Sequence, residues 1–513
     1  MTATRPAKVI AADEAVALIS DGATLAVGGF VGIAVPEALL IALADRFRER
    51  GGPRGLTLLF GGGQGDGGLR GLNHLALDGL VARAIGAHWG LVPALGALAH
   101  DGRIEAYCLP MGVMSRLHRE TAAGGPGLLT RVGLGTFVDP RIEGGRMNAV
   151  SPEVVVRLIE LDGEQLLFYP CHRIDVAFLR GTTADEHGNV TMEHEAATLD
   201  SLSIAQATKS SGGIVIVQAE RITAGRLPAR DVRIPGIFVD GVVVAADIGS
   251  HMQTFGESYN PAYVGDAGTG AVAAPEAVGL DARRAIARRA ATLLVPGAVV
   301  NLGIGIPEGI VAAARERGIL DAITLTVEDG AIGGLPAGGL SFGAAAGPQA
   351  IIDEPYQFDF YDGAGVDQAF LGMAQVDRDG NVNVSRFGER LIGAGGFIDV
   401  SHGARRIAFV GTFTAGARLD VGAGRLAILR EGTVPKFVAR VQQLTFSAAQ
   451  ARAKGQSVLY ITERCVLRLA DDGLELIELA PGVSLERDVL GQMGFQPRVA
   501  AELRTMDPAI FTD

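Results

Sequence analysis

Glu328 is the residue whose type and position offer the clearest chemistry. It follows residues 323–327, where apolar side chains alternate with threonines, and it opens the sequence EDGAIGG. This alternation predicts a strand, and open α/β sheets bind ligands beyond the carboxyl ends of their strands. A carboxylate is ionised at neutral pH without the help of a base, and it can attack an activated acyl group such as a thioester directly. Glu328 is therefore our candidate nucleophile.

Two glycine-rich turns could supply the hydrogen-bond donors that this chemistry requires. Attack on an acyl carbon gives a tetrahedral intermediate, whose oxyanion needs N–H groups. The sequence NLGIGIPEGI, residues 301–310, predicts a strand-to-helix turn, and IGAGGFIDV, residues 392–400, predicts a second one. The amides that we expect to be exposed are those of Gly303, Ile304, Gly305, Gly393, Gly395 and Gly396. Turns of this kind also bind phosphates.

The elements that must position these residues occur twice in the chain. Residues 22–60 predict a strand, a glycine turn that ends in Pro-Glu, a helix and another strand, and residues 297–327 repeat this order. The segment TADEHGNVTM, residues 183–192, likewise matches QVDRDGNVNV, residues 375–384, and a predicted strand follows each. Two matches in the same order indicate two homologous halves rather than a solenoid, whose repeats are shorter.

Alternating strands and helices predict that each half is an open, mainly parallel α/β sheet with helices on its faces. A segment rich in Gly, Ala and Pro separates the halves and is the expected linker. We therefore expect an N-terminal domain of residues 1–265, a linker of residues 266–284 and a C-terminal domain of residues 285–513. Aligning the halves places Gly61 opposite Glu328, so the scaffold itself does not need this carboxylate.

Composition limits the classes of ligand and partner. A formal net charge of −12 over 513 residues argues against a nucleic-acid-binding protein. No stretch reaches the roughly 18 apolar residues of a membrane span, and acids interrupt the N-terminal segment, so we expect no signal peptide. Three cysteines without CxxC spacing favour free thiols in a reducing compartment. We expect a cytoplasmic protein that binds neither nucleic acid nor membrane, and no metal-ligand spacing occurs.

Seven short segments occur together in chain order, and their combination is specific although each alone is not. They are GQGDGG (63–68), GLGTFVDPR (133–141), LGIGIPEGI (302–310), VEDGAIGG (327–334), YQFDFYDGAGVD (356–367), GNVNVSRFG (380–388) and GAGGFIDV (393–400). The combination resembles family I coenzyme A transferases, in particular the single-chain acetate/propionate type, in which an alpha-like and a beta-like half are fused. The resemblance spans about residues 8–505 and implies a fold similar to that of ribose-phosphate isomerases.

The resemblance also implies roles for individual residues. Glu328 would be the nucleophile, and the turns at Gly303–Pro307 and at Gly395 and Gly396 would supply oxyanion amides and contacts to coenzyme A (CoA). The implied reaction moves CoA from an acyl-CoA, most readily a short-chain one, to a free carboxylic acid by a ping-pong mechanism through a glutamyl-CoA thioester. CoA and acyl-CoA are substrates here, so no cofactor is expected. A homo-oligomer, either a dimer or a tetramer, is expected. Lys436 is a candidate contact for the CoA phosphates, with a solvated surface lysine as the alternative.

Met111 departs from the pattern of the family. It stands in CLPMGVMS, residues 108–115, where related sequences usually have a glutamine. A thioether cannot donate a hydrogen bond, so Met111 predicts an acyl pocket that is larger, more apolar or altered in its preference. Two other activities stay open at this point: an acyl-CoA hydrolase that uses the same glutamate, and a sugar-phosphate isomerase that uses Glu328 as a base.

Overall fold

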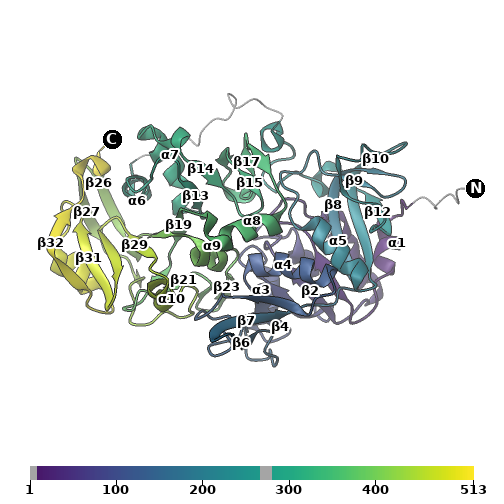
Figure 1. The fold of residues 1–513 in the computed structure, drawn as a ribbon, viewed down its shortest axis with the longest axis horizontal. Coiled ribbons are helices and arrows are strands. Elements are labelled where there is room, and N and C mark those ends of the chain that lie inside the picture. Colours follow the sequence, from purple (N-terminus) through teal and green to yellow (C-terminus); the bar gives the residue numbers. More distant parts are fainter. Residues whose placement is uncertain (1–7, 266–279, 513) are drawn as a thin grey trace, which may run out of the picture.

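The computed structural model describes residues 8–265 and 280–512, which form two α/β halves. Figure 1 shows them side by side, with the N-terminal half in purple to teal and the C-terminal half in green to yellow. Buried apolar side chains from both halves form one continuous cluster. The predicted α/β class is confirmed, and the two halves share a core rather than standing apart.

The N-terminal half is built on a sheet whose parallel strands run in the order β12-β10-β8-β1-β2-β3-β4, with β9 and β11 attached antiparallel at the end of β8. The strands are β1 Thr24–Val27, β2 Leu56–Phe60, β3 Val81–Gly86, β4 Glu105–Cys108, β8 Val176–Asp185, β9 Val190–Thr191, β10 Ile214–Thr223, β11 Val232–Ile234 and β12 Gly241–Val244. A small antiparallel sheet contains β5 Gly127–Thr130, β6 Arg157–Leu161 and β7 Glu164–Pro170. The helices are α1 Ala12–Ala17, α2 Glu37–Arg50, α3 Pro93–His100, α4 Met111–Ala122 and α5 Ser201–Ser210.

The C-terminal half is built on a longer sheet in the order β18-β15-β14-β13-β19-β24-β29-β30-β31-β32. Its strands are β13 Val299–Leu302, β14 Thr324–Thr326, β15 Ala331–Ile332, β18 Ala350–Ile351, β19 Gln368–Gly372, β24 Arg406–Val410, β29 Ser457–Ile461, β30 Cys465–Ala470, β31 Gly473–Leu479 and β32 Arg498–Thr505. Its helices are α6 Ala282–Ala291, α7 Gly309–Glu316, α8 Glu354–Phe360, α9 Phe397–Gly403 and α10 Ala448–Ala453. Short antiparallel strand pairs flank the sheet: β16 Leu335–Pro336 with β17 Ala345–Ala346, β20 Gln375–Val376 with β21 Val382–Asn383, β22 Arg386–Phe387 with β23 Arg390–Leu391, β25 Thr414–Ala415 with β28 Val434–Pro435, and β26 Arg418–Gly422 with β27 Arg425–Arg430.

The two halves repeat the same central strand order. The parallel strands β10-β8-β1-β2 of the first half correspond to β24-β19-β13-β14 of the second. The matched sequence turns agree in detail, because Asp185 accepts hydrogen bonds from the amides of His187 and Asn189, and Asp377 accepts them from those of Asp379 and Asn381. An Asp side chain that binds backbone amides ahead of it stabilises a turn, so the turn chemistry was duplicated with the strands.

The strand that precedes Glu328 differs from its prediction. Only Thr324–Thr326 form a strand, and Leu325, Thr326 and Val327 are all buried. Alternating apolar and polar residues predict one buried and one exposed face, but a strand inside a mainly parallel sheet is covered on both faces. The hydroxyl of Tyr361 donates to the hydroxyl of Thr326 (2.9 Å), which satisfies this buried polar group.

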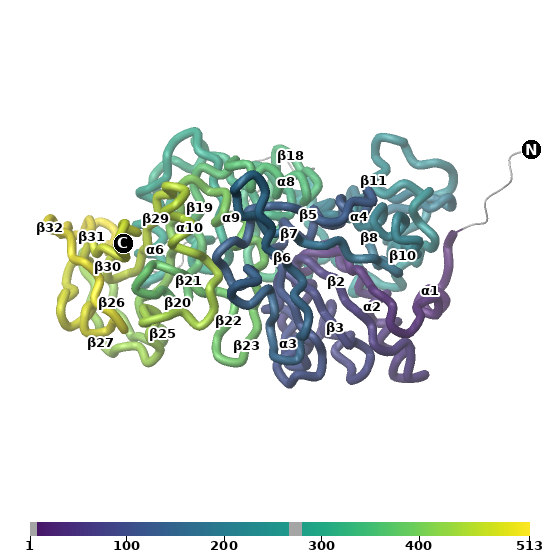
Figure 2. The backbone as a smooth tube through the Cα atoms, turned by 60° about the horizontal axis from the view of Figure 1, so that its bottom comes forward, coloured from purple at the N-terminus to yellow at the C-terminus, as the bar shows by residue number. Residues whose placement is uncertain are grey.

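Helix α4 of the N-terminal half packs against α8 and α9 of the C-terminal half, and α3 packs against β23 (Figure 2). The contact contains polar links as well as apolar ones. Arg116 pairs with Asp362 (2.6 Å), both side chains about 10% exposed, and the Gly112 amide donates to the Asp399 carboxylate (3.2 Å). These buried links cross from one half to the other, so they fix the relative position of the two sheets.

The structure describes only the last part of the expected linker. Residues 266–279 lie outside the described residues, while α6 begins at Ala282, so residues 282–284 of the expected linker are helical. Asp281 begins this helix by accepting a hydrogen bond from the Arg284 amide, the usual role of an N-cap. Within residues 8–265 and 280–512, no helix combines the length and the apolar character that crossing a membrane would require.

Candidate active site

The sequence-predicted nucleophile lies in a cavity of about 320 Å³ between the two halves. Residues that follow β2, β3 and β4 line it from the N-terminal half, and residues that follow β13, β14 and β19 line it from the C-terminal half. The residues from the N-terminal half are Gly62, His88 and Met111. Those from the C-terminal half are Ile304 and Glu328, which follow β13 and β14, and Gly372, which is the last residue of β19. Both sheets therefore present their carboxyl ends to one cavity, which is where such sheets bind ligands.

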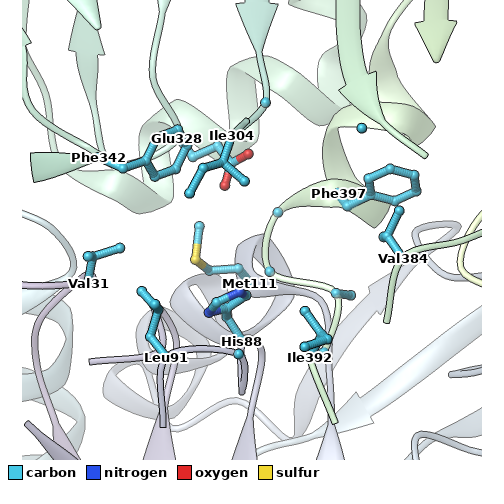
Figure 3. Close-up of a pocket in the computed structure, with 18 of the residues that line it drawn as sticks. Val31, His88, Leu91, Met111, Ile304, Glu328, Phe342, Val384, Ile392 and Phe397 are labelled. Atoms are coloured by element: carbon cyan, nitrogen blue, oxygen red, sulfur yellow. The ribbon is translucent and has the colours of Figure 1, made fainter. Parts of the chain in front are cut away.

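The cavity is almost entirely apolar. Its walls contain Phe30, Val31, Leu91, Phe342, Leu371, Val384, Ile392 and Phe397, together with several glycines. Glu328 and His88 are the two ionisable side chains among its lining residues. Figure 3 shows Glu328 and Ile304 entering from one side, with Met111, His88 and Leu91 on the opposite side. An apolar pocket with few polar groups is typical of a site that holds a small organic ligand.

The Glu328 carboxylate lies against the second glycine turn. Burial raises its pKa to about 7, and a hydrogen bond from the Gly396 amide opposes this shift. A Cβ atom on residue 396 would lie 2.5 Å from Glu328 Oε2, so this position must be glycine for the carboxylate to keep its place. Poorly solvated carboxylates are more reactive than hydrated ones because less water must be removed before attack.

The pKa of Glu328 predicts how activity depends on pH. Only the ionised form of the candidate nucleophile can attack a thioester, so we expect kcat/KM for an acyl-CoA to rise about tenfold per pH unit below the pKa and to level off above about 7. The measurement is the initial rate with subsaturating acyl-CoA from pH 5 to pH 8.5. A plateau that already begins at pH 5, near the ordinary glutamate value, would contradict the burial of this carboxylate.

Asp329, the acid next to Glu328, is buried away from the cavity. Its side chain is fully buried, and it is not among the residues that line the cavity. Burial raises its pKa well above its ordinary value, and the charge of Glu328 raises it further. Of the two adjacent acids, only Glu328 lines the cavity, so it is the candidate nucleophile.

The two glycine turns are both at the site, but the prediction about their amides is partly wrong. The Gly303 amide donates to the Phe370 carbonyl oxygen (2.9 Å), and the Gly395 amide donates to the Ala87 carbonyl oxygen (2.9 Å). The Gly393 amide donates to the Ser385 carbonyl oxygen (3.0 Å). Sheet pairing and packing between the halves use these donors, so they are not available to an oxyanion.

The amides of Ile304 and Gly396 remain as candidate donors in the cavity. No backbone acceptor for Ile304 occurs among the described residues, and Gly396 donates to Glu328 itself. Gly305 lies instead beside a neighbouring groove of about 560 Å³, which Arg283 of α6 also lines. The first turn therefore borders two adjacent spaces: Gly303 and Ile304 line the cavity, and Gly305 lines the groove.

Met111 lines the wall of the cavity, as expected from the sequence. It begins α4 directly after Pro110, the residue is 1% exposed, and its amide donates to the Gly395 carbonyl oxygen (3.0 Å). This hydrogen bond ties the N-terminal half to the second glycine turn. The position of Met111 fits the hypothesis that it shapes the acyl pocket, which stays a prediction.

Lys436 is neither fully solvated nor in the cavity. Its ammonium group donates to the Thr412 hydroxyl (3.0 Å), and burial lowers its pKa. The charges of Glu463 and Arg283 also act on it, so it lies near Arg283, which lines the groove that Gly305 borders. A role in binding CoA phosphates stays a prediction.

His88 is the cavity residue that sequence reasoning missed. It follows β3, whose sequence VARAIG is a short apolar strand in the N-terminal half. Position at the carboxyl end of a strand was the available signal, as it was for Glu328. The strand belongs to the half without the glutamate, however, and only the docking of the halves brings the two side chains into one cavity.

Comparison with known proteins agrees with this geometry. The family model described as "Coenzyme A transferase" matches residues 9–245. The chain is 45% identical to the caffeate CoA-transferase of Acetobacterium woodii, over 99% of this chain and 98% of that one. It is 42% identical to the acetate CoA-transferase YdiF of Escherichia coli K12, over 98% and 95% of the two chains.

The similarity extends to three dimensions. The crystal structure of the acyl-CoA transferase YdiF from Escherichia coli O157:H7, in a thioester complex with CoA, superimposes with a TM-score of 0.93 at 41% identity and covers 99% of this chain and 96% of that one. Full-length identity above 40% and a shared fold over the whole chain leave one assignment. This chain belongs to the coenzyme A transferase family and is a CoA-transferase.

Proposed function

We propose that the enzyme moves CoA from an acyl-CoA to a free carboxylic acid through a thioester between CoA and Glu328. One observation carries the proposal: a single ionisable carboxylate, with its pKa near neutrality, faces an apolar cavity at the carboxyl ends of two sheets. Such a group can attack a thioester, and the cavity keeps water away from the intermediates.

The proposed reaction proceeds in two balanced halves. The Glu328 carboxylate attacks the thioester carbonyl, the carbon–sulfur bond breaks, and an acyl-glutamyl anhydride and CoA thiolate form. The thiolate then attacks the glutamyl carbonyl, which releases the first carboxylate and leaves the glutamyl-CoA thioester. A second carboxylate reverses these steps. The Ile304 amide is the candidate donor to the oxyanions, and no redox step or cofactor is involved.

The CoA arm is proposed to run through the neighbouring groove. That groove adjoins the cavity, since Phe342 lines both. Arg283 lines it, and Lys436 lies near Arg283. Cationic side chains at the end of a groove can bind the phosphates of CoA, and binding energy from this distant part of the substrate can then be used at the reacting carbonyl.

Ping-pong kinetics are the expected signature of this order. The first acid must leave before the second enters, so reciprocal plots of initial rate against acyl-CoA concentration should give parallel lines at different acceptor concentrations. Lines that intersect would mean that donor and acceptor bind together, and would contradict the covalent order.

The two other activities left open by the sequence make different demands on the site. A sugar-phosphate isomerase needs partners for many hydroxyl groups, whereas the cavity offers two ionisable side chains in an apolar wall. An acyl-CoA hydrolase would use Glu328 with water as the final acceptor. The discriminating assay follows free CoA release without any acceptor acid: steady release at the rate of transfer would indicate the hydrolase.

The size of the cavity admits acyl groups beyond acetyl. Its volume of about 320 Å³ reaches the range of about 300–1,000 Å³ that holds whole small molecules. We propose short-chain acids as substrates and include larger apolar ones, because the two relatives named above are named for acetate and for caffeate. Assembly as a dimer or a tetramer stays a prediction that sedimentation can test.

Met111 predicts a shift in acyl preference that a single substitution can reveal. Met111→Gln returns a hydrogen-bond donor to a flexible apolar wall. The ratio of kcat/KM for acetyl-CoA over bulkier acyl-CoAs should rise by about tenfold to a few hundredfold, which corresponds to about 1–3 kcal/mol. The measurement compares acetyl-, propionyl-, butyryl- and a branched acyl-CoA in both proteins. Ratios within about twofold of the original would show that Met111 is ordinary packing.

A further inference from the structure

His88 is held so that its ring faces the cavity. The His88 amide donates to the Gly61 carbonyl oxygen (3.2 Å), and the preceding carbonyl, that of Ala87, accepts from Gly395. Two glycines make room for the imidazole, since a Cβ on Gly63 would lie 2.4 Å from Nδ1 and one on Gly90 would lie 3.1 Å from Nε2. The backbone is thus fixed from both halves, and the ring has little freedom to turn away.

The ring nitrogens have no hydrogen-bond or ion-pair partner in the described part of the chain, residues 8–265 and 280–512. This distinguishes His88 from the other residues with which the N-terminal half lines the cavity, because those are apolar residues and glycines. A histidine usually has a partner for its N–H when it is buried. Here the nitrogens border the cavity, so the missing partner can be a ligand.

Burial sets the form in which the ring meets that ligand. It lowers the pKa of His88 to about 4, so the imidazole is neutral at pH 7. A neutral imidazole offers one donor and one acceptor, which matches the one donor and the acceptor lone pairs of a hydroxyl group. A second carboxylate on the acid would need a cationic partner, and none of the described residues that line the cavity is cationic at pH 7.

We propose that His88 is a specificity-determining residue of the acyl pocket, which hydrogen-bonds a hydroxyl group on the acyl chain and so favours hydroxy acids over unsubstituted acids of the same size. The proposal rests on the proposed function, because it takes this cavity as the place of the acyl group. Figure 3 shows His88 across the cavity from Glu328, so the group that it meets is on the chain and not at the reacting carbonyl.

The test uses pairs of acceptor acids that differ by one hydroxyl group. With acetyl-CoA as donor, the pairs are butanoate with 3-hydroxy- and 4-hydroxybutanoate, and 3-phenylpropanoate with 3-(4-hydroxyphenyl)propanoate. The proteins are the wild type, His88→Leu, His88→Asn and, as matched control, Leu91→Ala, which enlarges the same wall without removing a polar atom. Thermal unfolding establishes that each variant is folded.

We expect at least one hydroxy acid to be favoured in the wild type by about threefold to thirtyfold in kcat/KM, mostly through KM, as one neutral hydrogen bond provides. His88→Leu should reduce this ratio to about one, and His88→Asn should keep part of it. Leu91→Ala should change both members of a pair and leave their ratio within about twofold. A wild type that favours no hydroxy acid, or a His88→Leu variant that keeps the preference, would overturn the proposal.

The intact-protein mass after incubation with acetyl-CoA separates this inference from the proposed function. If the wild type gains the mass of CoA while the ratios do not depend on residue 88, only the role of His88 is wrong. If the wild type gains no CoA at all, the proposed function itself fails, and the preference among acids loses its basis.

Discussion

Glu328→Ala is expected to lose at least about 10³-fold in turnover, the largest effect of any substitution in this enzyme. The carboxylate forms a covalent bond in each half of the proposed reaction, and its removal abolishes both intermediates rather than weakening one contact. The decisive quantity is kcat, because binding of CoA in the neighbouring groove should persist in the variant. Retention of more than a tenth of the wild-type kcat would exclude Glu328 as the nucleophile.

Glu328→Gln is the matched control for folding, since it keeps the shape of the side chain and removes the charge. The pKa of Glu328 is about 7 in the folded protein, against an ordinary value of 4.5. Between these values the folded state holds a proton that the unfolded state has lost, so the stability of the wild type falls as pH rises from about 4.5 to about 7. Glu328→Gln escapes this loss. It should be inactive, yet more stable than the wild type above pH 7 by about 1–3 kcal/mol, with no difference near pH 4.

Gly396→Ala is expected to lose about 10²-fold in kcat without unfolding the protein. The added Cβ would lie 2.5 Å from Glu328 Oε2, so the carboxylate must move out of its position. Residue 396 has φ −84° and ψ 0°, which alanine adopts without strain, so the backbone is not the source of the loss. Displacing a reacting group by about 1 Å can cost about a hundredfold.

The matched control is Gly372→Ala, in the wall of the same cavity. Its new Cβ would meet only the Ile304 carbonyl oxygen, at 4.0 Å, and its φ is not in the left-handed region. This variant should stay within about fivefold of the wild type with acetyl-CoA. If Gly396→Ala and Gly372→Ala were equally active, contact with the Glu328 carboxylate would not be what requires glycine at residue 396.

The candidate nucleophile and the duplicated fold could both be proposed from the sequence, because both depend on local patterns. Glu328 is marked by its place after a strand and by the contrast with Gly61 in the other half. The duplicated turns at Asp185 and Asp377 are also local, since each uses side chains within four residues. Such features can be predicted without knowledge of tertiary contacts.

The features that the sequence could not predict depend on how the halves meet. The amides of Gly303 and Gly395 looked free, but their acceptors are Phe370 and Ala87, which are distant in sequence. His88 joins the site only because α4 and the second glycine turn hold the two halves together. The antiparallel strands toward the two ends of the C-terminal sheet, such as β15 and β30, were likewise not distinguishable from parallel ones by their short apolar patterns.

The central claim is that Glu328 carries CoA covalently, and mass spectrometry tests it most directly. The enzyme is incubated with acetyl-CoA or another acyl-CoA, digested under mildly acidic conditions and mapped, with a parallel sample trapped by hydroxylamine. We predict that the CoA adduct, or its hydroxamate product, lies on the peptide that contains Glu328, and that Glu328→Gln shows neither. An adduct on another peptide, or turnover without any adduct for every acyl-CoA that serves as substrate, would contradict the account.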